Sequence, residues 1–273
     1  MTKQPIKIFV INLKSSIERR KMMESQLNKL NLSFEIFDAI HGASLTEEEI
    51  MDLYDLDYYN SRPAYYSLGM VGCTLTHYYI YKKIVEDKIL NAFILEDDMA
   101  LNIDLPEILN KLPDEIKKDE AIMLFYQSYS PIKLSKDSAV PLAGQYKLYQ
   151  VADLNGLIST AAYFISYEAA QAMLNKILPI SNVPDDWKKF YDRNMLNGVR
   201  VVYPFLLDNT YQKTTINPTT KGGLLFQKVL SFVEDYKVFP IYHLLKRRRK
   251  KNTARTRCCF IVDEPIKHLR ITA

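Results

Sequence analysis

The stretch Ala92-Phe93-Ile94-Leu95-Glu96-Asp97-Asp98 decides the fold prediction, because four apolar residues run directly into three adjacent carboxylates. A short apolar run bounded by polar residues is typical of a buried strand in a parallel sheet. The three acids then lie at the carboxyl end of that strand, where open α/β sheets bind their ligands. The sequence therefore predicts a ligand site at this end of the sheet.

The spacing of the three acids bears on what that ligand is. Alternation along an extended chain places Glu96 and Asp98 on one side and Asp97 on the other. Two carboxylates that face the same way repel one another unless a positive group lies between them. Mg²⁺ and Mn²⁺ prefer oxygen ligands and usually also contact a substrate phosphate. On this segment alone, a metal site and a solvated acidic turn both remain open.

Strands and helices alternate on both sides of this stretch. We expect strands at residues 6–13, 34–37, 93–95, 122–126, 161–165 and 199–203, and helices at 17–30, 46–53, 69–85 and 167–178. Residues 127–150 are expected to form an irregular or hairpin insertion. This alternation predicts one α/β domain over residues 1–222, with a mostly parallel central sheet.

Residues 223–273 have a different character. Leu224 to Val238 carries apolar residues at approximately helical spacing, and Lys246 to Arg257 contains eight Lys or Arg residues and no acid. Since the whole chain carries +4 and this block eight positive charges, the rest sums to −4. An amphipathic helix before a cationic block is typical of a segment that lies on anionic lipid. A solvated tail and a nucleic-acid-binding tail are the alternatives.

The absence of several sequence motifs excludes some classes of protein. The eight glycines form neither a GxGxxG nor a GxxxxGK[ST] loop, which disfavours kinases, P-loop NTPases and dinucleotide oxidoreductases. A zinc HExxH and a GxSxG elbow are also missing, and three cysteines give no disulfide framework. We expect no secretory signal and no membrane span. A diphosphate bridged by a metal ion is the ligand that best fits an acidic strand end.

Six segments occur in an ordered pattern: Val10–Leu13 with Glu18–Arg20, Asp38–Gly42, Gly69–His77, Phe93–Asp98, Thr160–Ile165 with Ala169 and Ala170, and Pro184–Asp186. Over roughly residues 5–220 this pattern resembles glycosyltransferase family 25, the lipooligosaccharide-biosynthesis galactosyltransferases of Gram-negative bacteria. The resemblance implies a GT-A-like nucleotide-sugar fold and inverting transfer of a hexose, expected to be galactose. The implied donor is UDP-galactose or a related UDP-hexose, and the implied acceptor is lipooligosaccharide or lipopolysaccharide.

The resemblance also implies roles for particular residues. Glu96-Asp97-Asp98 takes the place of the metal-binding DxD motif, with Asp98 as a direct ligand of Mn²⁺ or Mg²⁺ and Glu96 as a ligand or ribose contact. Gln212 is expected as a third ligand, with Asp208 as the alternative. Donor contacts are expected at Asn12, Leu13, Arg19, Ala39, Gly42, His77, Glu96 and Asp97. Acceptor contacts are expected at Thr160, Tyr163 and Trp187. For Arg19, a solvated helix face is the alternative; for Ala39 and Gly42, an ordinary turn; for His77 and Trp187, the core. Cys73 is interpreted as a core residue.

An inverting transferase needs a carboxylate that takes the proton from the acceptor hydroxyl. Asp185 and Asp186 are the candidates, and a helix N-cap ahead of Trp187 is the alternative for either one. The leading hypothesis is a metal-dependent hexosyltransferase at the cytoplasmic face of the inner membrane, held to anionic lipid by Lys246–Arg257, with no nucleic acid expected. The rival hypotheses are an inactive nucleotide-sugar-binding protein and a nucleic-acid-associated protein that acts through its basic tail.

Overall fold

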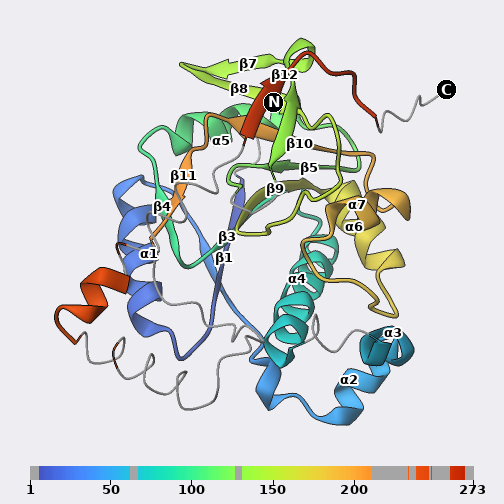
Figure 1. Cartoon of the computed structure of the whole chain (residues 1–273). Coiled ribbons are helices and arrows are strands. Elements are labelled where there is room, and N and C mark those ends of the chain that lie inside the picture. The colour runs from blue at the N-terminus through green and yellow to red at the C-terminus, as the bar shows by residue number, and fades with distance from the viewer. Residues whose placement is uncertain are drawn as a thin grey trace.

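A computed structural model describes residues 6–61, 67–126, 131–210, 233, 238–245, 247 and 259–267. Its centre is an eight-stranded sheet in the order β2-β1-β3-β9-β5-β10-β8-β7 (Figure 1). These strands are β1 (Lys7–Asn12), β2 (Glu35–Asp38), β3 (Asn91–Glu96), β5 (Glu120–Met123), β7 (Val140–Ala143), β8 (Tyr146–Gln150), β9 (Ala162–Ser166) and β10 (Gly198–Tyr203). Two small sheets pair β4 (Met99–Leu101) with β11 (Leu207–Asn209), and β6 (Ile132–Ser135) with β12 (Cys259–Val262).

The helices connect and cover these strands. They are α1 (Ile17–Lys29), α2 (Glu47–Leu53), α3 (Leu56–Ser61), α4 (Leu68–Glu86), α5 (Leu105–Glu115), α6 (Tyr167–Lys176) and α7 (Trp187–Asp192), with short 3₁₀ turns η1 (Gly42–Ser44) and η2 (Lys136–Ser138). Helix α2 begins with a capping box, in which the Thr46 side chain accepts from the Glu49 backbone N–H while the Glu49 side chain accepts from the Thr46 N–H.

The α/β class is confirmed, but the sheet is mixed where a mostly parallel one was predicted. Strand β1 runs parallel to β2 and β3, and β10 runs parallel to β5. The other neighbours are antiparallel: β9 with both β3 and β5, and β8 with both β10 and β7. All five residues of β9 are buried, so its apolar pattern is that of any central strand and carries no information about direction.

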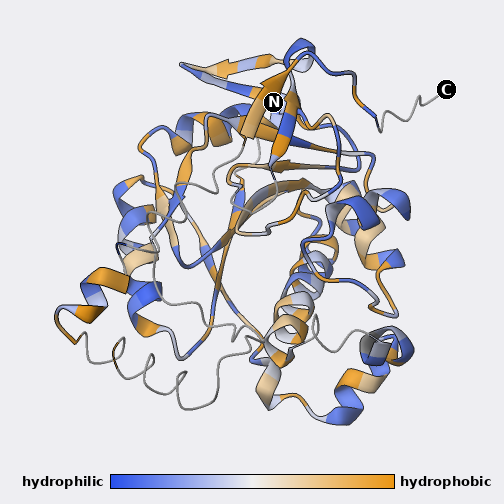
Figure 2. Cartoon of the chain, viewed as in Figure 1, coloured by the Kyte–Doolittle hydropathy of each residue, from blue (hydrophilic) through white to orange (hydrophobic). Residues whose placement is uncertain are grey.

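The sheet is the middle of three layers. One core contains residues of α4, α6 and α7, and the other contains residues of α1 and α5. Side chains of β3 alternate between the two cores, with Ile94 in the first and Phe93 and Leu95 in the second, all fully buried. Figure 1 shows α1 and α4 on opposite sides of β1 and β3, and Figure 2 shows apolar colour along the central strands. Burial of each such side chain contributes about 1.5–3 kcal/mol.

The C-terminal segment is partly described. Residues Cys259–Val262 form β12, which pairs in parallel with β6, and Lys133 binds Glu264 at 2.6 Å beside it. This part of residues 223–273 therefore lies against the α/β body. The predicted helix 224–238 and the basic block 246–257 lie outside the described residues, apart from Val233, Val238 and Arg247. Among the described helices, none has the length and apolar character that crossing a membrane requires.

Candidate functional site

A pocket of about 680 Å³, open to solvent, lies where β1 and β3 end. Twelve residues line it: Ile11, Leu13, Arg19, Ala39, Ile40, Gly69, Cys73, Thr76, His77, Glu96, Asp97 and Asp98. Because β1, β2 and β3 are parallel, their carboxyl ends meet at one edge, which is where α/β sheets bind ligands.

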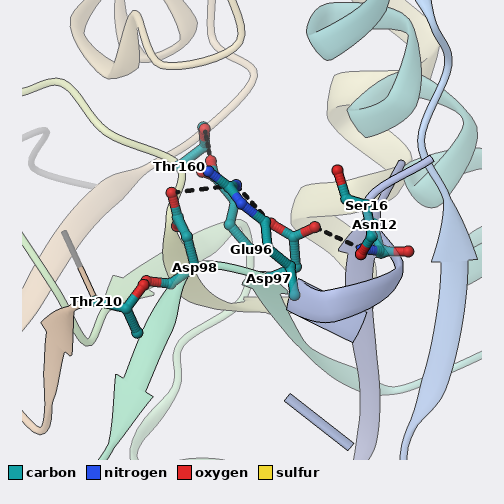
Figure 3. Close-up of polar contacts among 8 residues, drawn as sticks. Asn12, Ser16, Glu96, Asp97, Asp98, Thr160 and Thr210 are labelled. Atoms are coloured by element: carbon teal, nitrogen blue, oxygen red, sulfur yellow. Dashed lines mark hydrogen bonds and ion pairs between the residues drawn. The ribbon is translucent and has the colours of Figure 1, made fainter. Parts of the chain in front are cut away.

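Glu96 is the last residue of β3, and Asp97 and Asp98 form the turn into β4. The Thr160 hydroxyl donates to Glu96 Oε1 at 3.2 Å (Figure 3). Burial, and then the negative charge of Asp98, raise the pKa of Glu96 to about 8. Glu96 is therefore a carboxyl group that pays a large penalty for ionisation unless a positive group approaches it.

Asp97 is held by two hydrogen bonds from α1 and β1. Asn12 Nδ2 donates to Asp97 Oδ2 at 2.6 Å (Figure 3). Arg19 Nη1 donates to Asp97 Oδ1 at 2.9 Å. The same Arg19 nitrogen lies 3.5 Å from Asp98 Oδ2. Part of the positive charge that the three acids require is thus supplied by arginine. Asn12 is buried and absent from the pocket lining, so its contact in this structure is with Asp97 and the Ser16 carbonyl.

Asp98 is fixed through its backbone. Its carbonyl accepts hydrogen bonds from the Thr210 N–H at 2.9 Å and the Thr210 hydroxyl at 2.8 Å. Burial raises the pKa of the Asp98 carboxyl, although Arg19 acts in the opposite direction. Within the described part of the chain, no three His, Cys, Asp or Glu side chains are grouped as a metal site. Gln212, the predicted third ligand, lies outside the described residues.

The loop after β2 forms the opposite wall of the pocket. Ala39 and Ile40 line it, as does Leu13. Gly42 instead packs against α4, because a Cβ there would lie 1.6 Å from the Leu68 carbonyl oxygen. The small residue at position 42 therefore permits a close approach between loop and helix, and the structure does not bring it to the pocket as a donor contact.

Helix α4 supplies a third wall. His77 is 1% exposed, and its Nδ1 lies 2.8 Å from the Tyr163 hydroxyl. Cys73, interpreted from the sequence as a core residue, lines the pocket and is partly exposed, so that interpretation is corrected. Ile11, Ile40, Gly69 and Thr76 were also missed as lining residues. All four lie in segments that carry the family resemblance, 10–13, 38–42 and 69–77. Only some members of those segments were assigned to the site.

The three predicted acceptor contacts are all buried. Trp187 is fully buried, donates from Nε1 to the Ser159 carbonyl at 2.9 Å, and packs edge-on against Tyr163 at 5.2 Å between ring centres. Tyr163 is also fully buried, and Thr160 is 6% exposed. None of the three lines the pocket. The structure therefore assigns Trp187 and Tyr163 to the core, and Thr160 to the support of Glu96.

Asp185 and Asp186 have different surroundings. Asp186 is the N-cap of α7, with Oδ1 accepting from the Lys189 N–H at 3.2 Å, as the capping alternative predicted. Asp185 Oδ2 accepts from the Ser159 N–H at 3.3 Å, and burial raises the pKa of its carboxyl. The charge of Asp185 also contributes to the raised pKa of Glu96 and of Cys73. Neither Asp185 nor Asp186 is among the residues that line the pocket.

Known proteins resemble this chain at low identity. The lipooligosaccharide biosynthesis protein lic2B of Haemophilus influenzae is 23% identical over 96% of this chain and 92% of its own length. Procollagen galactosyltransferase 1-A of Xenopus laevis is 28% identical over 63% of this chain. The matched region covers only 29% of the length of that protein. Human procollagen galactosyltransferase 2 is 28% identical over 63% of this chain and 29% of its own length.

A solved glycosyltransferase involved in glycosylation of the major capsid of PBCV-1 aligns with 77% of the chain at a TM-score of 0.32 and 14% identity. Residues 5–188 match the family described as "Glycosyltransferase family 25 (LPS biosynthesis protein)", and the chain belongs to glycosyltransferase family 25.

Proposed function

We propose that the protein is an inverting, metal-dependent hexosyltransferase of GT-A-like fold that moves galactose from a UDP-sugar to a lipooligosaccharide or lipopolysaccharide acceptor. The observation that carries the proposal is the pocket at the ends of β1 and β3, with three adjacent carboxylates in its lining, in a chain of family 25. Relatives named as procollagen galactosyltransferases and as a lipooligosaccharide biosynthesis protein support the choice of sugar and acceptor.

Arg19 and the loop after β2 are suited to bind the nucleotide. Arg19 lies at the pocket beside the start of α1, where backbone N–H groups and the helix dipole also favour an anion. Its guanidinium is held by Asp97 at 2.9 Å, which orients it for the diphosphate. Ala39 and Ile40 offer an apolar wall against which the base or ribose packs.

Glu96 and Asp98 fit a hard divalent cation. Both supply carboxylate oxygens to the pocket, and burial raises the pKa of both, so an added positive charge stabilises their ionised forms. Thr160 and Thr210 fix these acids through the Glu96 side chain and the Asp98 backbone. When bound, Mn²⁺ or Mg²⁺ offsets the negative charge of the departing UDP diphosphate.

Asp185 is our candidate for the base that takes the proton from the acceptor hydroxyl. Its neighbour Asp186 is committed to capping α7, whereas the Asp185 side chain accepts a hydrogen bond from the Ser159 N–H and caps no helix. A carboxyl whose pKa is raised by burial accepts a proton more readily at neutral pH than an exposed aspartate. The Asp185→Asn protein should bind donor normally but fail to transfer the sugar.

The decisive experiment measures UDP release from a panel of UDP-hexoses, with and without Mn²⁺, in the presence of a lipooligosaccharide acceptor. We expect UDP-galactose to be used and turnover to need the metal ion. Asp98→Ala should abolish turnover while leaving the thermal unfolding transition cooperative. Asp192→Ala, which removes an exposed acid paired with Lys188, is the matched control. A fully active Asp98→Ala protein would remove the basis of the proposal.

The location proposed for the enzyme is the anionic surface of the inner membrane, on the cytoplasmic side. The eight basic residues between Lys246 and Arg257 support it, because each adds about 1 kcal/mol of attraction to anionic lipid. Neutral replacement of all eight should reduce co-sedimentation with phosphatidylglycerol vesicles and spare activity on soluble acceptors. Unchanged sedimentation, or tighter binding of RNA or DNA than of vesicles, would contradict the membrane role.

A further inference from the structure

His77 has a buried polar atom for which the described residues supply no partner. The side chain is 1% exposed, and its Nε2 makes no hydrogen bond to the described part of the chain. Buried side-chain nitrogen atoms are nearly always hydrogen-bonded, so an exception requires an explanation. His77 also lines the pocket, which makes a bound ligand the natural source of the missing partner.

The other ring nitrogen is fixed by two buried tyrosines. Tyr163 OH lies 2.8 Å from His77 Nδ1 and 3.0 Å from Tyr81 OH. If Tyr81 donates to Tyr163, and Tyr163 donates to Nδ1, every hydroxyl hydrogen has an acceptor. In the reverse direction the Tyr81 hydrogen would find no acceptor among the described residues. Nδ1 is therefore the acceptor, and the proton of the neutral imidazole resides on Nε2.

The imidazole is also kept uncharged. Burial lowers the pKa of His77 to about 3, so the ring is neutral throughout the physiological range. It therefore presents a single uncharged N–H donor. Such a donor suits a hydroxyl or carbonyl oxygen, whereas the charged diphosphate is better matched by Arg19 and a cation.

The position of the ring indicates which edge meets the ligand. Tyr163 lies in the core and is absent from the pocket lining, whereas Cys73 and Thr76 of the same helix face are part of it. Nδ1 is therefore occupied by a core residue, and Nε2 is the ring nitrogen that remains for a ligand. Nε2 is covered in the free protein, so a ligand atom reaches it after a side-chain shift of the kind that tightens site contacts on binding.

We propose that the Nε2–H of His77 donates a hydrogen bond to a hydroxyl or carbonyl oxygen of the nucleotide-sugar donor. Tyr81 and Tyr163 are positioning residues that hold the imidazole in the tautomer that can donate. The inference rests on the proposed function, because it assigns a contact to the same donor pocket.

The test compares two variants by calorimetric titration with UDP and with UDP-galactose in the presence of Mn²⁺. His77→Phe keeps a planar ring and removes the donor, whereas His77→Gln keeps an N–H near the position of Nε2. We expect the dissociation constant to rise roughly fivefold to tenfold for His77→Phe, the usual effect of one neutral hydrogen bond, and to change by less than about threefold for His77→Gln. Tyr79→Phe, at an exposed position of the same helix, is the control.

A ¹⁵N NMR spectrum of the wild-type imidazole gives a readout that does not depend on a variant folding. We expect a proton on Nε2 between pH 5 and pH 8, and loss of this fixed tautomer in Tyr163→Phe. Weakened binding of both ligands by His77→Phe places the hydrogen bond on the nucleotide, and weakened binding of UDP-galactose alone places it on the hexose; either supports the proposal.

Two results overturn the inference alone: normal donor binding by His77→Phe, or a wild-type imidazole protonated on Nδ1. A wild-type protein that binds neither UDP nor UDP-galactose overturns the proposed function, and the inference with it. The two failures are therefore distinguishable in one set of titrations.

Discussion

Substitution of Gly72 by alanine tests whether the close approach between α4 and the loop after β2 shapes the pocket. A Cβ at this position would lie 2.4 Å from the Ile40 carbonyl oxygen and 2.7 Å from the Gly42 nitrogen. Both are backbone atoms, so no side chain can move aside. Restoring the shortest contact to 3.0 Å, below which real Cβ contacts essentially never fall, requires loop and helix to separate by 0.6 Å.

The loop resists that movement because it is held at two points. The Ile40 N–H donates to Thr76 Oγ1 at 2.9 Å, and the Ala39 N–H donates to the Asn12 carbonyl at 2.9 Å. Forcing an extra methyl into packed structure costs about 1–3 kcal/mol. For chains of 150–250 residues each kcal/mol lowers Tm by about 2–4 °C, so we expect Gly72→Ala to melt roughly 2–12 °C below wild type. Donor affinity should also fall, because Ala39 and Ile40 line the pocket.

Thermal unfolding and calorimetric titration with UDP check this expectation. Gly42→Ala should be worse than Gly72→Ala, since its Cβ would lie 1.6 Å from the Leu68 carbonyl oxygen. Gly198→Ala is the control: nothing lies within 4 Å of a Cβ there, and the change should be neutral or stabilising by about 0.4–1 kcal/mol. If Gly72→Ala melts and binds donor as Gly198→Ala does, the reasoning from backbone contact is wrong.

Three further predictions concern charged residues. Asp186→Ala should cost about 1 kcal/mol of stability through the lost N-cap and leave UDP release intact; abolished turnover would instead make Asp186 the base. Burial raises the pKa of Asp185, so the folded protein loses stability as pH rises from the ordinary aspartate range through that raised value. Asp185→Asn should therefore raise Tm at pH 7 and give no gain below about pH 3, and a lower Tm at pH 7 would contradict this sign. Arg200 binds both carboxylate oxygens of Glu120 at 2.6 Å, and both residues are buried; Arg200→Ala should cost about 3–5 kcal/mol in chemical unfolding, and a loss below 1 kcal/mol would refute it.

The sequence was informative wherever local pattern and local structure coincide. The apolar run ending at Glu96 predicted both the central strand β3 and the acidic end of the pocket. It could not reveal the direction of β9, because a strand buried on both faces has the same apolar pattern whichever way it runs. Pairing with β3 and β5 is decided by contacts far apart in the chain.

The same limit applies within the site. Arg19 was predicted to be a donor contact, but its pairing with Asp97 joins residues 78 positions apart and is not visible in the sequence. The partner of His77 Nδ1 is Tyr163, which is 86 positions away. Trp187 was predicted to contact the acceptor. It is instead buried by packing against Tyr163 and Phe190, and no local sequence pattern indicates that packing.

The pairing of β12 with β6 determines how the basic block can be studied. Because Cys259–Val262 is hydrogen-bonded to Ile132–Ser135, a stop codon placed before residue 246 would delete a strand together with the positive charges. The uncovered edge of β6 would then offer unpaired N–H and C=O groups to other molecules, a known route to aggregation. A truncated protein that sediments with vesicles could therefore be self-associated instead of lipid-bound, and charge-neutralising substitutions that preserve the C-terminus are the sound design.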